Sequence, residues 1–260
     1  MPRTGRWAVL GCIASLAAGQ DAGELYRLGA RRFEEHNLAG AVEALQQSVQ
    51  AKPDNAAAWK ALGVAYAAQG DHESAEKPFR TACELQPSLP DACQYYGRTL
   101  YLENRFRPAL EVLRRALKED KSNPQIHRLI ALSLEALGEG NEAGGEFREA
   151  VRLDRDSPPN SDPAIDYGVH LFRQGRAEEA LAPLENALKR HPDSARAHLE
   201  LGCVLLALDR LPAAESHLER AVALDAQSSR AHLLLGKVYQ RLGKTDAAAE
   251  QLRQGSRTVK

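Results

Sequence analysis

Hydrophobic and polar residues alternate along most of the chain with a helical period, so that apolar positions recur every three or four residues. The pattern predicts pairs of amphipathic helices, each of about 12 to 14 residues, joined by short polar turns such as QGDHES and RQGRAE. Because one such hairpin cannot bury its apolar face alone, the hairpins are expected to stack side by side.

A repeat of this hairpin is visible in the spacing of small residues. Glycine occurs at 29, 63, 97, 168, 202 and 236, and Ala131 fills the remaining place. Neighbouring members are 34 residues apart, except for 37 residues between Ala131 and Gly168. Alanine follows 12 residues after each member, and a large apolar residue follows four residues later. The chain is therefore divided into seven repeats: 22–55, 56–89, 90–123, 124–157, 161–194, 195–228 and 229–260.

Gly63 lies inside the predicted helix WKALGVAYAAQGD, where glycine costs roughly 1 kcal/mol relative to alanine. Its recurrence at the same place in six repeats indicates a structural reason. We expect the two helices of each hairpin to approach closely there, with Gly63 opposite Ala75.

The second repeat carries a recognisable set of residues: Trp59, Leu62, Gly63, Tyr66, Ala75, Phe79, Ala82 and Pro87. This set resembles the tetratricopeptide repeat, and the resemblance extends over residues 20–260. It implies an all-α fold, a right-handed superhelical solenoid of stacked hairpins. It also implies a protein-binding function in which the first helices line a concave groove.

Two departures from the regular pattern are notable. The segment RDSPPNSDP holds three extra residues, and Pro158, Pro159 and Pro163 prevent a helix from continuing through it. It is either a longer surface turn or a break at 155–163 that separates four repeats from three. The chain also ends without the separate polar capping helix that solenoids usually have.

The first residues differ from the rest of the chain. Arg3 and Arg6 precede the apolar stretch 7–18, and Ala17 and Gly19 are small, as signal peptidase requires. Residues 1–19 are therefore predicted to be a secretory signal peptide, which places the mature protein in the bacterial periplasm or outside the cell. If this leader is not cleaved, the alternative is a cytoplasmic protein. No membrane span is expected after it.

Lys and Arg number 34 and Asp and Glu number 35, spread along the chain, so the basic footprint of a nucleic-acid-binding protein is missing. Three cysteines follow the leader: Cys83, Cys93 and Cys203. An odd number is unusual in an exported protein. Cys83 and Cys93 flank a short turn and could pair, but the preferred interpretation is that they fill helix interfaces as small apolar residues.

Catalytic and metal-binding patterns are weak. His127, His198 and His232 occupy the fourth position of their repeats, as Trp59 does, which indicates packing and not a shared metal site. The sequence has no G-x-S-x-G, H-E-x-x-H or C-x-x-C motif and no nucleotide-binding loop. We therefore predict a protein that is not an enzyme and that needs no cofactor or metal.

The resemblance implies that positions 2, 5, 9 and 12 of each repeat face the groove. These positions carry a net charge of about +3 together with several apolar side chains, including Ile165. The expected partner is a protein or peptide with hydrophobic anchors and acidic or C-terminal carboxylate groups. The alternative is a structural, self-associating module that uses the last hairpin and the Cys83/Cys93 region. The predicted groove residues are Tyr26, Phe33, Lys60, Val64, Arg98, Tyr101, Arg128, Phe172, Arg196, Leu206, Arg230 and Lys237.

Overall fold

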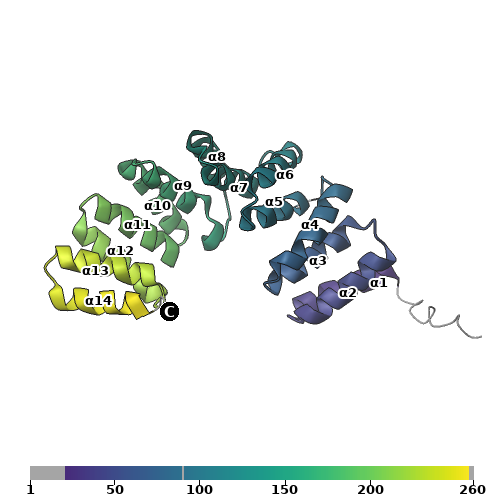
Figure 1. The fold of residues 1–260 in the computed structure, drawn as a ribbon, viewed down its shortest axis with the longest axis horizontal. Helices are drawn as coiled ribbons and strands as arrows, with labels where there is room; N and C mark the ends of the chain where they lie inside the picture. The colour runs from purple at the N-terminus through teal and green to yellow at the C-terminus, as the bar shows by residue number, and fades with distance from the viewer. Residues whose placement is uncertain (1–20, 90, 258–260) are drawn as a thin grey trace, which may run out of the picture. The chain divides into compact units, whose positions relative to one another are not determined.

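The computed structural model describes residues 21–89 and 91–257, so the predicted signal peptide at 1–19 lies outside the described part of the chain. Within those two ranges the chain forms 14 α-helices, one short 3-10 helix and no strand. The helices follow one another as hairpins, as Figure 1 shows, and the predicted all-α repeat architecture is confirmed. None of the helices formed by these residues is long and apolar enough to cross a membrane.

The chain divides into two compact units, residues 1–99 and 100–260, and the division falls within α5. Buried residues of α2 and α3 form the core of the first unit, including Leu45 and Leu62. The helices up to the division are α1 (Ala22–Glu34), α2 (Leu38–Ala51), α3 (Ala56–Ala68), α4 (His72–Leu85) and α5 (Ala92–Leu102).

The second unit contains the remaining hairpins and a continuous core between α9 and α13 that includes Leu184, Leu201 and Leu235. Ile165 belongs to this core and is 0% exposed, so its predicted place on the groove surface is wrong. The helices are α6 (Phe106–Glu119), α7 (Pro124–Ala136), α8 (Gly140–Leu153), η1 (Pro159–Ser161), α9 (Pro163–Arg173), α10 (Ala177–Arg190), α11 (Ala195–Ala207), α12 (Leu211–Leu224), α13 (Ser229–Arg241) and α14 (Thr245–Arg257).

The recurring glycine lies where the two helices of a hairpin approach closely. A Cβ atom at Gly202 would lie 2.6 Å from Cγ of Leu218, and one at Gly63 would lie 2.6 Å from the Phe79 ring. The side chain nearest to Gly63 is thus Phe79, the large apolar residue of the second helix, and not Ala75 as expected. The large residue fills the space that the missing side chain leaves, which explains why the two positions recur together.

A second regular feature is the turn inside each hairpin. The fifteenth residue of every repeat has a positive φ, between 58° and 80°, which ends the first helix in a left-handed conformation. Glycine adopts this conformation without cost, and asparagine and aspartate are the next most tolerant residues. The residues are Gly70, Gly138, Gly175 and Gly243, with His36, Asn104 and Asp209 in the other repeats.

The aromatic residue at the fourth position of a repeat fixes the turn that precedes it. Trp59 donates its indole N–H to the carbonyl oxygen of Pro53, six residues earlier, at 2.8 Å. The three histidines at this position place Nε2 against the carbonyl of the residue six positions earlier, at 3.0 to 3.3 Å. The predicted packing role is confirmed for this position, with a hydrogen bond in addition. The histidine pairs are His127 with Lys121, His198 with Pro192 and His232 with Ala226.

The other ring nitrogen of each histidine faces a residue 19 positions later on the second helix. For His127 this residue is Glu146, whose carboxylate lies 2.6 Å from Nδ1. Both ring nitrogens of His127 therefore face acceptors, which only the protonated ring can satisfy as a double donor. The hydrogen bond to Glu146 is the main reason why the pKa of His127 is raised.

This arrangement predicts a pH dependence of stability. Because the folded state raises the pKa of His127, its contribution is complete below the unfolded value near pH 6.5 and is lost as pH rises through the folded value. The loss should amount to about 1.5 to 3 kcal/mol, typical of a hydrogen bond to a charged group. Urea unfolding of the wild type and of His127→Gln on both sides of neutrality measures it. A stability difference between the two proteins that does not shrink at the higher pH would contradict the assignment.

The structure corrects the interpretation of two cysteines. Cys83 on α4 and Cys93 on α5 form a disulfide whose Cα atoms are 4.7 Å apart, so they are not merely apolar fillers. Spacing along the sequence left this open because pairing depends on how the turn between the helices brings the two Cβ atoms together. Cys203 is free and half-buried.

Replacing both bonded cysteines should measurably destabilise the first unit. The disulfide closes a short loop of the chain, for which the loss of loop-closure entropy in the unfolded state gives about 2 to 3 kcal/mol. Thermal unfolding of Cys83→Ala/Cys93→Ala, compared with wild type before and after reduction, tests this. The bond is refuted if reduction leaves the wild-type transition unchanged.

The inserted segment between repeats four and five lies inside the second unit and is held by polar contacts. Gln125 Nε2 donates to Ser157 Oγ at 2.6 Å and to the Ser161 carbonyl at 3.0 Å. Arg190 pairs with Asp154 and Asp162, whose side chains are only 1% and 0% exposed. These contacts link the segment to α7 and α10. A hinge at 155–163 stays a prediction.

Candidate functional site

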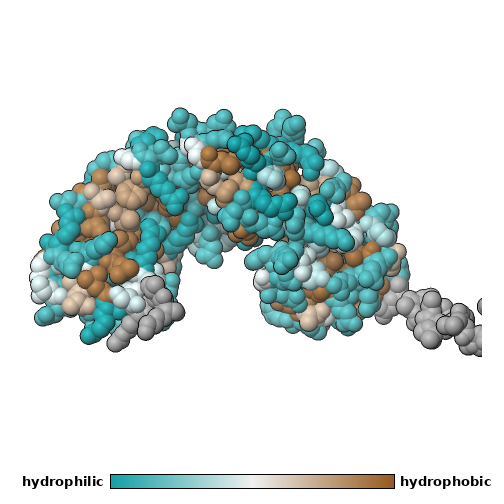
Figure 2. All heavy atoms as spheres, in the orientation of Figure 1, coloured by the Kyte–Doolittle hydropathy of each residue, from teal (hydrophilic) through white to brown (hydrophobic). Residues whose placement is uncertain are grey.

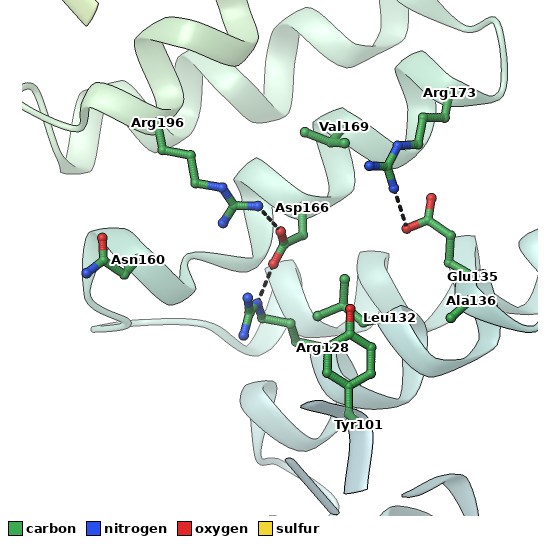
Figure 3. Close-up of a pocket in the computed structure, with 10 residues that line it drawn as sticks. All are labelled: Tyr101, Arg128, Leu132, Glu135, Ala136, Asn160, Asp166, Val169, Arg173 and Arg196. Carbon is green, nitrogen blue, oxygen red and sulfur yellow. Dashed lines mark hydrogen bonds and ion pairs between the residues drawn. The ribbon is translucent and has the colours of Figure 1, made fainter. Parts of the chain in front are cut away.

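One hollow of the second unit lies on the first helices of three successive repeats. Its volume is about 540 Å³, within the usual range for ligand pockets, and Figure 3 shows its side chains. The residues come from α7, α9 and the start of α11, with Tyr101 from the end of α5 and Asn160 from η1. The lining residues are Tyr101, Arg128, Leu132, Glu135, Ala136, Asn160, Asp166, Val169, Arg173 and Arg196.

Three of the predicted groove residues, Tyr101, Arg128 and Arg196, meet in this pocket. A second hollow of about 490 Å³ shares Asn160 and Arg196 with the first and continues along α11 to the start of α13. The two hollows therefore adjoin each other at the start of α11. We call the first hollow, with its ten lining residues, the α7/α9 pocket.

Asp166 is the electrostatic centre of the α7/α9 pocket. Its side chain is 5% exposed, and its two carboxylate oxygens accept hydrogen bonds from Arg128 and Arg196, one oxygen for each guanidinium (Figure 3). A buried carboxylate needs such partners, because an unpaired charge away from water is costly. Because the Arg128 and Arg196 cations share the single Asp166 carboxylate, the three side chains together carry a net charge of +1.

A second ion pair lies at the other end of the pocket. Glu135 accepts from Arg173 Nη1 at 3.3 Å, and its other oxygen lies 3.3 Å from Nδ1 of the buried His170. The His170 ring packs on Phe147 with the ring centres 5.2 Å apart. Between the two ion pairs, Leu132 and Val169 provide apolar surface (Figure 3).

Tyr101 contributes a hydroxyl group beside the apolar surface. Burial, followed by the charge of Asp166, raises the pKa of Tyr101 above its usual value near 10. The phenol is therefore neutral across the physiological range and can both donate and accept a hydrogen bond.

The arginine–carboxylate pairing recurs in the next repeat. Arg230 Nη2 donates to Glu200 Oε2 at 2.8 Å, and this hydrogen bond is the main reason why the pKa of Arg230 is raised. In both cases an arginine at position 2 of one repeat binds an acidic residue at position 6 of the preceding repeat, 30 residues earlier. Asp166 and Glu200 were missed by the sequence analysis because position 6 was not assigned to the groove. The recurring spacing of 30 residues between the acidic residue and the arginine was the sequence signal that could have revealed both pairs.

These carboxylates change the expected charge of the groove. Adding Asp166 and Glu200 to the predicted positions lowers the net charge from about +3 to about +1. The predicted positions therefore sum to only a weak positive charge, and Asp166 and Glu200 hold three of their arginines, Arg128, Arg196 and Arg230, in fixed positions.

All twelve predicted groove residues are half-buried or exposed, none is fully buried, and the structure distributes them over both units. Tyr26 and Phe33 pack against the core of the first unit, and Phe172 and Leu206 pack against the core of the second. Arg98 is exposed in the first unit and does not line the α7/α9 pocket. The other predicted residues outside the pocket are Lys60, Val64, Arg230 and Lys237.

Within the described residues, no group of three His, Cys, Asp or Glu side chains is placed to hold a metal ion. The face that Figure 2 shows is mostly hydrophilic, and hydrophobic residues gather on it in the region of α11 to α13. The α7/α9 pocket thus combines fixed charges, a neutral phenol and a modest apolar area, an arrangement suited to binding a polypeptide segment.

Comparison with known families identifies the repeats. Residues 24–160, just over half of the chain, match the family described as the cytochrome c-type biogenesis protein H TPR domain. The chain belongs to this family of tetratricopeptide repeat domains. Residues 167–229 and 205–259 match two further tetratricopeptide repeat families, so the repeats beyond the insert are of the same kind.

Several curated proteins are similar to this tetratricopeptide repeat chain. Cytochrome c-type biogenesis protein CycH of Pseudomonas aeruginosa is 27% identical over 162 residues, which cover 59% of this chain and 39% of that protein. The human Protein IFIT1 homolog B is 31% identical over 143 residues, or 51% of this chain and 29% of that protein. The chain thus spans about two fifths or less of the length of these relatives.

A solved structure of a tetratricopeptide repeat protein from Parabacteroides merdae matches with a TM-score of 0.72 at 15% identity. The match covers 93% of this chain and 94% of that one. At this level of identity the likeness shows the fold alone. The predicted tetratricopeptide repeat fold is confirmed by the family matches and by this structure.

Proposed function

We propose that this tetratricopeptide repeat chain is a non-enzymatic scaffold that binds a segment of a partner protein in the α7/α9 pocket. The observation that carries the proposal is the Arg128–Asp166–Arg196 bridge next to the apolar surface of the pocket. Scaffolds of this kind recognise a segment by a few placed charges and apolar contacts.

The charge of the bridge selects the chemistry of the partner. Asp166 neutralises only one of its two arginines, and the Arg196 side chain is 37% exposed, so a second anion can approach it from the pocket. A carboxylate is the natural complement, because a guanidinium binds carboxylates with directed hydrogen bonds.

The apolar part of the pocket selects a neighbouring side chain. Leu132, Ala136 and Val169 can bury an aliphatic or aromatic group, and the Tyr101 hydroxyl can bond to the backbone of an extended segment. The proposed ligand is therefore a segment that carries an apolar side chain beside an acidic or C-terminal carboxylate.

The experiment is a selection from a library of peptides with free C-termini, followed by fluorescence anisotropy on the selected sequences. Val169→Asp should weaken binding about tenfold or more, because it places a carboxylate in the apolar part of the pocket. Arg148→Asp, on the exposed surface of α8, is the matched control and should bind like wild type. Equal loss in both variants, or no loss in either, would refute the pocket.

Reversing the charge of Arg128 is a poor test, because the variant would place a second carboxylate beside the buried Asp166 and destabilise the unit. Blocking the carboxylate of the peptide is a better one. Amidation of the C-terminus, or replacement of the acidic residue by its amide, should weaken binding about tenfold if the bridge recognises the carboxylate. Unchanged affinity would remove the carboxylate from the proposal and leave the apolar contact.

The match to the cytochrome c-type biogenesis family suggests a setting for this function. We propose that the chain acts during the assembly of c-type cytochromes, as a binding component in the cell envelope, to which the predicted signal peptide would direct it. Loss of the gene should then lower the haem-stained c-type cytochromes of the native organism. Normal levels would reject this setting but not the binding function of the pocket.

A further inference from the structure

A pair of histidines outside the α7/α9 pocket has an unusual arrangement. His198 on α11 and His217 on α12 face each other with their Nδ1 atoms 3.0 Å apart. The ring centres are 5.2 Å apart and the ring planes are inclined by 35°. Both side chains are half-buried, so small ions in solution can reach them.

The protonation of the pair follows from a neighbouring contact. Nε2 of His198 lies 3.0 Å from the Pro192 carbonyl oxygen, which can only accept, so Nε2 carries the proton. In the neutral ring, Nδ1 of His198 therefore has a free lone pair, directed at Nδ1–H of His217. Two ring nitrogens thus compete for one proton at a short distance.

Neutral imidazoles are the form that binds metal ions. In the tautomer protonated at Nε2, each ring of the pair offers the lone pair of its Nδ1 atom to an ion placed between them.

We propose that His198 and His217 form a binding site for a divalent transition-metal ion such as Zn²⁺, with both Nδ1 atoms as ligands. With Zn–N distances of about 2.0 to 2.1 Å, two neighbouring ligands of one ion lie roughly 3 to 3.4 Å apart. The observed 3.0 Å needs only a small rotation of the rings to meet that spacing.

The proton balance is simple. The ion takes the place of the proton between the two Nδ1 atoms, and the displaced proton binds to Nε2 of His217, so the neutral pair releases no net proton. The Pro192 carbonyl keeps its hydrogen bond to Nε2 of His198 and thereby holds that ring in the tautomer that the ion needs.

Equivalent positions in other repeats lack this chemistry. His127 faces Glu146 with a raised pKa, and His232 faces the amide of Gln251. Because no third protein ligand converges with His198 and His217 in the described part of the chain, water or an external donor must complete the coordination of the ion.

The test is isothermal titration of the purified full chain with ZnCl₂ near neutral pH, in a buffer that does not bind metals. Wild type should bind one ion, and His217→Gln should weaken this binding about tenfold or more. His217→Gln copies the His232–Gln251 pair, so the variant is expected to fold, which circular dichroism verifies. The matched control is His232→Gln, which removes the histidine equivalent to His198 in the next repeat and should bind Zn²⁺ like wild type.

A second readout locates the ion. Nitrogen NMR of the histidine rings should show Zn²⁺-dependent shifts at Nδ1 of His198 and His217, while Nε2 of His198 stays protonated. Wild-type binding by His217→Gln, equal loss in both variants, or the absence of saturable binding would each overturn the proposal.

Discussion

Gly202→Val is expected to destabilise the second unit by about 3 kcal/mol, at the upper end of the range for overpacked cores. A Cβ atom at Gly202 already lies 2.6 Å and 2.9 Å from Cγ and Cδ2 of Leu218, and valine adds two more methyl groups. Cγ is the branch point of the leucine side chain and can move only by rotation about the Cα–Cβ bond, which the packed core around the fully buried Leu218 opposes, so α11 and α12 must separate. Ala131 occupies the equivalent position in repeat four at 0% exposure, which shows that one methyl group can be accommodated when the helix pair is adjusted for it.

The matched control is Gly145→Val. Gly145 also lies inside a helix, α8, but a Cβ atom there would have no neighbour within 4 Å. The change in helix propensity is the same in both variants, so the difference in urea midpoint between them isolates the packing term. Equal midpoints would contradict the close helix approach as the reason for the recurring glycine.

Arg190→Met is expected to cost about 3 to 5 kcal/mol, the loss typical of an interrupted buried ion pair. Methionine keeps the apolar stem of the side chain but leaves Asp154 and Asp162 without their shared cation. One oxygen of Asp162 has no hydrogen-bond partner even in the wild type, and Nε2 of His191 lies 3.8 Å from it, beyond hydrogen-bonding distance. Arg210→Met, which breaks an exposed pair with Glu178, should cost less than about 1 kcal/mol.

The stability of the Arg190→Met variant should depend on pH in a defined direction. Burial raises the pKa of Asp162 even with Arg190 present, so its carboxyl binds a proton more readily in the folded state than in the unfolded one. Stability then falls as pH rises through the folded value and recovers as pH falls. In Arg190→Met, which lacks the cation beside Asp162, the stability regained at low pH should be larger than in wild type. If Arg190→Met instead lost more stability than wild type at low pH, the assignment to Asp162 would be contradicted.

The fold could be predicted in detail from the sequence because the repeat multiplies weak local signals. A single glycine in a helix is weak evidence for a close helix contact. Gly63 and its equivalents are stronger evidence, because each lies 16 residues before a large apolar residue. The left-handed turn residue could have been found in the same way, since glycine alternates there with asparagine, aspartate and histidine.

The site was predicted less completely, because side-chain pairing between repeats is not visible in a single repeat. The groove positions of Arg128 and Arg196 were expected, but their partner Asp166 was not, since it lies one residue from an assigned groove position. Ile165 was misplaced for a related reason: residue type and position do not reveal that the core of α9 to α13 encloses it. The Cys83–Cys93 bond likewise depends on turn geometry that the spacing leaves open.

The most direct test of the proposed binding site is site-specific photo-crosslinking. A photoreactive amino acid is placed either at Val169, inside the α7/α9 pocket, or at Arg148, on the exposed surface of α8. Each protein is irradiated with a peptide chosen by the library selection, and the covalent adduct is quantified by mass spectrometry. We expect an adduct at Val169 that excess unlabelled peptide suppresses, and none at Arg148. Adducts of equal yield at both positions, or an adduct at Arg148 alone, would contradict the proposed site.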